Sequence, residues 1–235
     1  MYKGSKILAI IPARGGSKGI PGKNIIDVNG KPLIQYTIDA AKGSRYIDKV
    51  VVSTDSTEIA EVAKSCGAEV PFLRPDFLAS DSAKTIDALV HCVKKLQDCG
   101  EKYDYIVLLQ PTQPLRTSLH IDEAIMEIIN SGVTSLVSIS LVKEHPILMR
   151  TLNAEKATLS NLLKTPSTVR RQDFPNYYKV NGAIYINSIK HFNNTISLND
   201  NKHAYIMDQK YDLDIDDYND LELLRIILKS KSPHQ

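Results

Sequence analysis

The sequence predicts an open α/β fold with a mostly parallel sheet and helices on both of its faces. Apolar runs of strand length alternate with helical segments from the N-terminus to about residue 141. This alternation is typical of parallel strands joined by helical crossovers. The first run, Lys6–Pro12, is apolar at every position after its lysine, as expected of a strand buried on both faces.

The expected elements of the first half follow in order. Leu33–Lys42 is expected to be a helix, and the β-branched segment Lys49–Thr54 a second strand. Asp55–Cys66 carries apolar residues at helical spacing and is followed by Gly67, a residue that commonly ends helices. Glu69–Leu73 is expected to be a short strand.

The second half begins with the same alternation and then loses it. Thr85–Cys99 and Leu119–Ser131 are expected helices, and Tyr105–Leu109 and Thr134–Leu141 are expected strands. Residues 143–180 show no clear period, and a long stretch of this kind is more often functional than an idle connection. Strand-like alternation returns later in the chain, before a last helix, at Gly182–Asn187, Ala204–Met207 and about Asp217 to Lys229.

Composition indicates an ordinary soluble protein with one domain over residues 1–235. Hydrophobic residues make up 43% and the formal net charge is +2, which gives no reason to expect binding to nucleic acid or to a membrane surface. No stretch is apolar for long enough to span a bilayer. The three cysteines form no CxxC pattern, so reduced thiols and a cytoplasmic location are expected.

The segment Ala13–Asn24 follows the first strand and has the composition of an anion-binding loop. It holds four glycines and the cations Arg14, Lys18 and Lys23. Glycines allow the backbone to approach an oxyanion, and the cations can neutralise phosphate charge. Its spacing fits neither a P-loop nor the dinucleotide fingerprint, so a Rossmann oxidoreductase is disfavoured. A loop after a strand of a parallel sheet lies where ligands bind.

A run of aspartates precedes the last helix. Asp214 and Asp216 point to the same side if this segment is extended, and two carboxylates together can hold Mg²⁺. Alternatively, one aspartate caps the helix, a role that Asp217 can fill.

Two further segments have candidate binding groups. Gln110 and Thr112 lie in a proline-containing loop after a predicted strand, which suits recognition of a base or sugar, or serves only as a turn. Adjacent arginines at Arg170 and Arg171 can grip a carboxylate or form a solvated cationic face.

Together these segments resemble the CMP-sialic acid synthetase family, which are cytidylyltransferases that activate nine-carbon acidic sugars. Blocks similar to those of the family occur in the same order along nearly the whole chain: IIPARGGSKGIPGKN, VSTD, LASD, LLQPTQPLR, RQDFP, NGAIYI and DLDIDD. The resemblance implies a Rossmann-like fold of the nucleotide-diphospho-sugar transferase type, with residues 143–180 as an insertion for dimerisation and sugar binding.

The resemblance implies a role for each site residue. The triphosphate would be held by Ala13, Arg14, Gly15, Lys18, Lys23 and Asn24. The cytosine and ribose would be bound by Ser80, Asp81 and Ser82. The acceptor sugar would be bound by Gln110, Arg171, Lys179 and Asn181. Asp214 and Asp216 would bind Mg²⁺ and, with Arg14 and Lys23, would form the catalytic set.

The resemblance also implies the reaction, which is CMP transfer from CTP to a sialic or legionaminic acid by a homodimer. Lys179 stands where sialic acid members often carry Arg or His, which leaves the sugar open. Two alternatives remain: a cytidylyltransferase for another acidic sugar such as 3-deoxy-manno-octulosonate, and a non-catalytic nucleotide-binding regulatory module.

Overall fold

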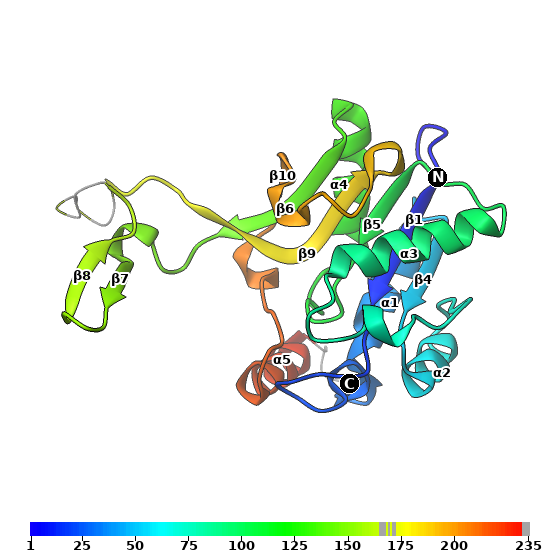
Figure 1. Ribbon diagram of the computed structural model, residues 1–235, viewed down its shortest axis with the longest axis horizontal. Coiled ribbons are helices and arrows are strands. Elements are labelled where there is room, and N and C mark those ends of the chain that lie inside the picture. The colour runs from blue at the N-terminus through cyan, green and yellow to red at the C-terminus, as the bar shows by residue number, and fades with distance from the viewer. Residues whose placement is uncertain (165–167, 169, 171–172, 232–235) are drawn as a thin grey trace.

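The computed structural model describes residues 1–164, 168, 170 and 173–231, and a six-stranded sheet organises them (Figure 1). The strand order is β10-β6-β9-β5-β1-β4. The strands are β1 (Ile7–Pro12), β4 (Lys49–Ser53), β5 (Tyr105–Leu108), β6 (Ser135–Leu141), β9 (Tyr178–Ser188) and β10 (His203–Ile206). Only β9 of these six runs antiparallel to its neighbours, which confirms an open, mostly parallel sheet.

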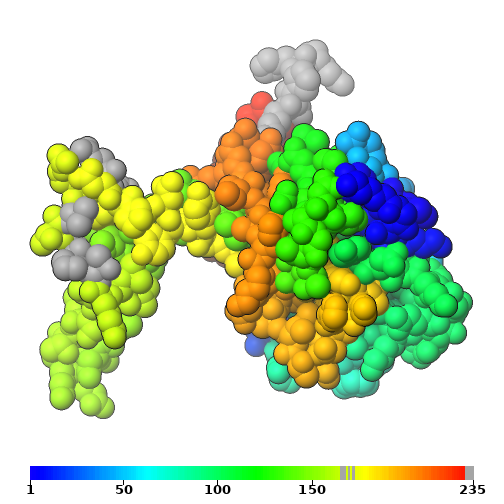
Figure 2. Space-filling view, turned by 90° about the horizontal axis from the view of Figure 1, so that it is seen from above, coloured from blue at the N-terminus to red at the C-terminus, as the bar shows by residue number. Residues whose placement is uncertain are grey.

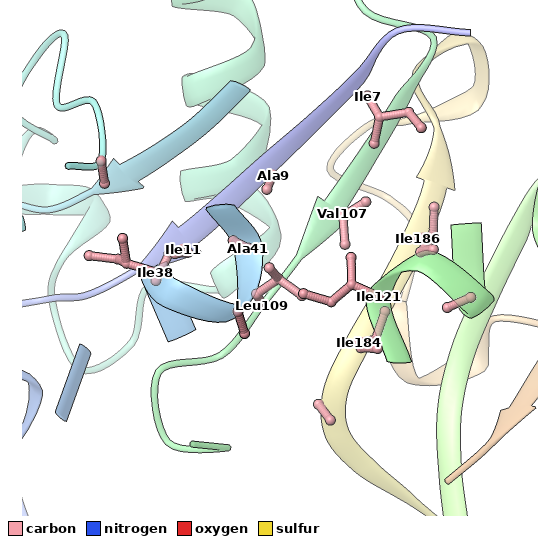
Figure 3. Packing of buried hydrophobic residues seen from close by; sticks show 14 of the residues in the cluster. Ile7, Ala9, Ile11, Ile38, Ala41, Val107, Leu109, Ile121, Ile184 and Ile186 are labelled. Atoms are coloured by element: carbon pink, nitrogen blue, oxygen red, sulfur yellow. The ribbon is translucent and has the colours of Figure 1, made fainter. Parts of the chain in front are cut away.

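Helices cover both faces of this sheet, as the alternating pattern predicts. The helices are α1 (Leu33–Lys42), α2 (Thr57–Ser65), α3 (Thr85–Asp98), α4 (Ser118–Ser131) and α5 (Tyr218–Lys231). In β1, Ile7, Ala9 and Ile11 pack with α1, α2 and α4 (Figure 3). Leu8 and Ile10 point the other way and pack with α3. Successive side chains of a strand face opposite sides, so β1 is buried on both.

The expected strand at Glu69–Leu73 is wrong. Only Glu69 pairs with the sheet, through an isolated bridge to Val51. Pro71 follows two residues later, and its lack of an N–H prevents the ladder from continuing. The preceding helix also begins later than expected, at Thr57, because the Ser56 side chain caps it by accepting from the N–H of Ile59.

The insertion is not wholly irregular, contrary to the prediction. A strand pair within it, β7 (Arg150–Asn153) and β8 (Thr158–Asn161), is antiparallel and projects away from the body of the molecule (Figures 1 and 2). We call residues 143–164 the arm. Nearly every residue of the pair is exposed. A pair that packs on no core has no buried face, so the sequence shows no apolar alternation there.

A separate apolar cluster anchors the C-terminal helix beside the Gly-rich loop. It joins Ile20 of that loop, Leu115, Ile215 and two leucines of α5 to Leu33 of α1 and to Val28 of β2 (Asp27–Val28), the strand that pairs with β3 (Lys31–Pro32). The cluster therefore brings the aspartate run, about 190 residues away in sequence, to the first βα connection. None of the described helices is long and apolar enough to cross a membrane.

Candidate active site

A cavity of about 530 Å³ opens at the carboxyl ends of β1 and β5. Its lining comes from the Gly-rich loop, the β5–α4 loop, the first turn of α3 and the aspartate run. The lining residues are Pro12, Arg14, Ser17, Lys18, Gly19, Lys23, Asn24, Arg74, Thr85, Gln110, Pro111, Thr112, Asp214 and Asp216. Four cations and two carboxylates thus face one space. Ligands of open α/β sheets bind at this edge.

Hydrogen bonds within and behind the Gly-rich loop fix its path. The side chain of Asn24 donates from Nδ2 to the carbonyl of Arg14, at 3.0 Å, and so closes the loop on itself. The Gly15 N–H donates to Oδ1 of Asp55 at 2.9 Å, and the Ala13 N–H donates to the carbonyl of Ser53. Ala13 and Gly15 therefore support the loop, whereas Arg14 and Asn24 reach the cavity.

The block at residues 80–82 contacts the cations of this loop. The Asp81 carboxylate lies 3.0 Å from Nη1 of Arg14 and 3.1 Å from Nζ of Lys18. Arg14 also donates to the Ser80 carbonyl at 3.1 Å, and the hydroxyls of Ser80 and Ser82 are 3.3 Å apart. Three residues predicted to bind cytosine and ribose thus border the predicted phosphate site.

Lys23 joins the Gly-rich loop to the aspartate run. Its Nζ donates to the carbonyl of Ile215 at 2.6 Å and lies 3.5 Å from Oδ1 of Asp216. Gly19 packs against the same segment, since a Cβ on Gly19 would lie 2.3 Å from the carbonyl oxygen of Asp216. Only glycine allows this contact, so the loop and the aspartate run dock backbone to backbone.

Asp214 and Asp216 face the cavity together, as the extended pattern predicts. Ile215 between them is fully buried in the third cluster and its N–H donates to the carbonyl of Thr112. Burial raises the pKa of the Asp214 carboxyl, and the nearby Asp216 charge raises it further. A hydrogen bond with Thr112 acts in the opposite direction. Asp217 caps α5 by accepting from two backbone N–H groups, so the other two aspartates are left to face the cavity.

Asn181 and Gly182 form a bulge in β9 beside the cavity. The register with β6 shifts between Val137 and Ile139. There Asn181 Oδ1 accepts from the Ser138 hydroxyl at 2.6 Å, and Gly182 has a positive φ of 76°. A bulge next to a site re-aims the chain. Asn181 is buried, and its Nδ2 has no hydrogen-bond partner in the described chain.

The other predicted acceptor residues lie in different surroundings. Nζ of Lys179 is 3.1 Å from the buried carboxylate of Asp212, and the Ser140 hydroxyl donates to the same oxygen at 2.5 Å. The structure therefore pairs Lys179 with the aspartate run instead of leaving it open. Arg171 lies outside the described residues.

Sequence reasoning missed a second cavity and two buried arginines. The second cavity, of about 490 Å³, shares Thr85 and Gln110 with the first and is lined by both polar and aliphatic side chains, most of them from residues 194–199, and by Tyr185. Arg74 lines the first cavity, and burial lowers its pKa. Arg116 lies wholly buried behind the site. The sequence signal that could have found Arg116 was its position in the LLQPTQPLR block. For Arg74 the only signal was its position before Pro75.

Comparison with known proteins agrees with this geometry. A family profile described as cytidylyltransferase matches residues 8–232. The chain belongs to the cytidylyltransferase family. Among solved structures, a CMP:2-keto-3-deoxy-manno-octonic acid synthetase complexed with CTP shares the fold, with a TM-score of 0.74, 19% identity and coverage of 97% of this chain and 100% of that one.

Three curated relatives are more similar in sequence. An N-acylneuraminate cytidylyltransferase of Escherichia coli is 38% identical over 97% of this chain and 53% of its own length. A CMP-N,N'-diacetyllegionaminic acid synthase of Legionella pneumophila is 40% identical over 79% of each chain. A pseudaminic acid cytidylyltransferase of Campylobacter jejuni is 34% identical over 95% and 97%. This family member therefore spans about half the length of the first relative and nearly all of the third.

Proposed function

We propose that the chain transfers CMP from CTP to the anomeric hydroxyl of a nine-carbon acidic sugar of the sialic or legionaminic type. The observation that carries this proposal is the cavity in which four cations and two carboxylates converge at the ends of parallel strands. The names of the relatives, which include acidic sugars of this kind, support the acceptor class.

The proposed reaction is a displacement at the α-phosphorus of CTP. A bond forms between the anomeric oxygen and that phosphorus, the bond to the bridging α–β oxygen breaks, and pyrophosphate leaves while the hydroxyl proton passes to solvent. Such transfers depend mainly on positioning and neutralisation of charge. Arg14, Lys18 and Lys23 would neutralise the triphosphate, and Lys23 is held between the Gly-rich loop and Asp216.

Asp214 and Asp216 fit a magnesium site. The two carboxylates face one cavity together, and Mg²⁺ is held by few protein oxygens together with phosphate oxygens. Bound there, Mg²⁺ would neutralise charge on the phosphates. Thr112 holds this pair in place through its contacts with Asp214 and with the N–H of Ile215.

The two adjoining cavities suit two substrates. The first is cationic and fits the triphosphate. The second combines neutral polar side chains with aliphatic ones and the Tyr185 ring, whose hydroxyl donates to Asn199 at 3.0 Å. Hydroxyl and amide groups of these kinds match a polyhydroxylated sugar. Gln110 lines both cavities and so would lie between donor and acceptor.

The arm supports a homodimer. Its exposed apolar side chains are Leu148, Met149, Leu152, Leu159 and Leu162. Apolar groups gathered on a projecting arm mark an interaction surface, and a second copy is the partner that the family resemblance predicts. Residues 143–180 would then reach the neighbouring subunit.

Release of pyrophosphate from CTP tests the proposal. The protein is assayed with Mg²⁺ and, separately, N-acetylneuraminate, diacetyllegionaminate, pseudaminate and 3-deoxy-manno-octulosonate. Release with one of the first three is expected. Release only with the eight-carbon acid would move the acceptor to that class. CTP binding without release for any acid would support the regulatory module.

A further inference from the structure

Arg116 is a buried cation whose guanidinium holds three elements together behind the site. Its Nη1 donates to the carbonyl of Ala183 in β9 at 2.8 Å, and its Nη2 to the hydroxyl of Thr37 in α1 at 2.7 Å. Both nitrogens also contact the carbonyl of Gln110 at 3.4 Å. Burial alone lowers the pKa of Arg116 to about 9, with no carboxylate of the described chain offsetting it.

Such a group is costly to bury, so its retention calls for a structural reason. An ionised side chain removed from water without a counter-ion loses several kcal/mol of solvation. An apolar side chain of similar size would avoid this cost but could not donate to three acceptors on three elements. The planar guanidinium, with five N–H groups in a fixed fork, is suited to that task.

Two of the three acceptors, in Ala183 and Gln110, belong to residues next to the bulge that carries Gly182. Ala183, whose carbonyl accepts from Arg116, follows Gly182. Gln110 approaches Gly182 from the β5–α4 loop. The Oε1 atom of Gln110 would lie 2.6 Å from a Cβ at Gly182, so the Gln110 side chain packs across the glycine. Arg116 therefore contacts the backbone carbonyl of Gln110, and Gly182 of the bulge lies against the Gln110 side chain.

We infer that Arg116 is a positioning residue that sets the Gln110 side chain between the two cavities. This inference rests on the proposed function, since Gln110 lies where donor and acceptor would meet. Arg116 lines neither cavity and acts through the Gln110 carbonyl and the bulge. Misplacement of a group at a reacting centre by about 1 Å costs roughly 100-fold in rate, so the position of this backbone matters for turnover.

A double-mutant cycle between Arg116→Lys and Gln110→Ala tests the inference. Arg116→Lys keeps a cation but loses the fork. It is expected to lower acceptor kcat/KM by about 10- to 100-fold, with the dissociation constant for CTP within about threefold. In the Gln110→Ala background the same change is expected to have little further effect. Additive losses in the cycle would overturn the inference, because a merely structural role is not masked by Gln110→Ala.

Gly182→Ala provides a second route if Arg116→Lys folds poorly. It places a Cβ against Oε1 of Gln110 and leaves Arg116 intact. A loss with acceptor is expected that Gln110→Ala relieves only in part, because the strain of a side chain at this positive φ remains. Asp122→Asn is the matched control. Asp122 is also buried, with Arg45 and Ser44 as partners, and its loss should lower the melting temperature without any coupling to Gln110.

Backbone amide exchange separates failure of this inference from failure of the proposed reaction. The Gln113 N–H donates to the Gln110 carbonyl, and the Ile215 N–H to the Thr112 carbonyl, so both report on the order of this loop. Arg116→Lys should speed their exchange while the amides of β1 stay protected. Unchanged exchange at both amides would overturn the inference even if no acceptor is turned over.

Discussion

Asp81 forms an ion pair with Arg14, which lines the first cavity, with Oδ1 3.0 Å from Nη1. The same carboxylate lies 3.1 Å from Nζ of Lys18. Hydrogen bonding by Lys18, with a further contribution from Arg14, lowers the pKa of Asp81. Asp81 thus pairs with two of the cations that a triphosphate would need.

Asp81→Asn should therefore strengthen binding of inorganic tripolyphosphate. The variant removes a competing anion, and we expect roughly a two- to fivefold lower dissociation constant by calorimetry without Mg²⁺. Tripolyphosphate carries no base or ribose, so the measurement isolates the phosphate site. Weaker binding would show that Asp81 supports the bound anion instead of competing with it.

Asp214→Asn should abolish most turnover and leave the fold intact. We expect kcat to fall by about 100-fold or more, with chelation of Mg²⁺ producing a similar loss in the unchanged protein. Asp217→Asn is the control from the same run. It weakens the cap of α5 and should lower the melting temperature by a few degrees while activity remains. Full activity of Asp214→Asn would remove Asp214 from the metal site.

Charge on the arm should break the proposed dimer. Leu152→Asp and Leu159→Asp place a carboxylate on exposed apolar positions of the strand pair, and desolvating it in an interface is costly. Sedimentation is expected to give half the mass of the unchanged protein. Ile226→Asp alters an equally exposed residue of α5 and should leave the mass unchanged. If the arm variants keep the dimer, the interface lies elsewhere.

Glu101 should make the free energy of unfolding depend on pH in the acidic range where its carboxyl titrates. Hydrogen bonds from Lys49 and then from the Tyr103 hydroxyl lower the pKa of the Glu101 carboxyl. A carboxyl with a lower pKa in the folded state stabilises it above the unfolded pKa of 4.5 and loses that contribution as pH falls. Glu101→Gln should therefore cost about 0.5 kcal/mol at pH 7 and nothing at low pH, as measured by urea unfolding. An equal cost at both pH values would exclude the ion pair as its source.

The strand–helix alternation determined the fold class, because strands and helices each have a side-chain periodicity that can be recognised from neighbouring residues alone. It failed at Glu69–Leu73, where Pro71 stops a strand of suitable composition. It also failed in the arm, where no core exists to impose a buried face. The aspartate pair was predictable for the same local reason: Ile215 faces the core, so its neighbours face the cavity.

By itself, the sequence determined the alternating α/β fold, the cationic Gly-rich loop, the two cavity-facing aspartates and the resemblance to cytidylyltransferases. Only the tertiary structure decided which distant groups meet: Asp81 with Arg14, Lys179 with Asp212, and Arg116 with the bulge beside Gly182. These contacts depend on the order of strands in the sheet and on one shifted register. No local sequence pattern indicates the strand order or the shifted register, because both bring together residues that are dozens of positions apart along the chain.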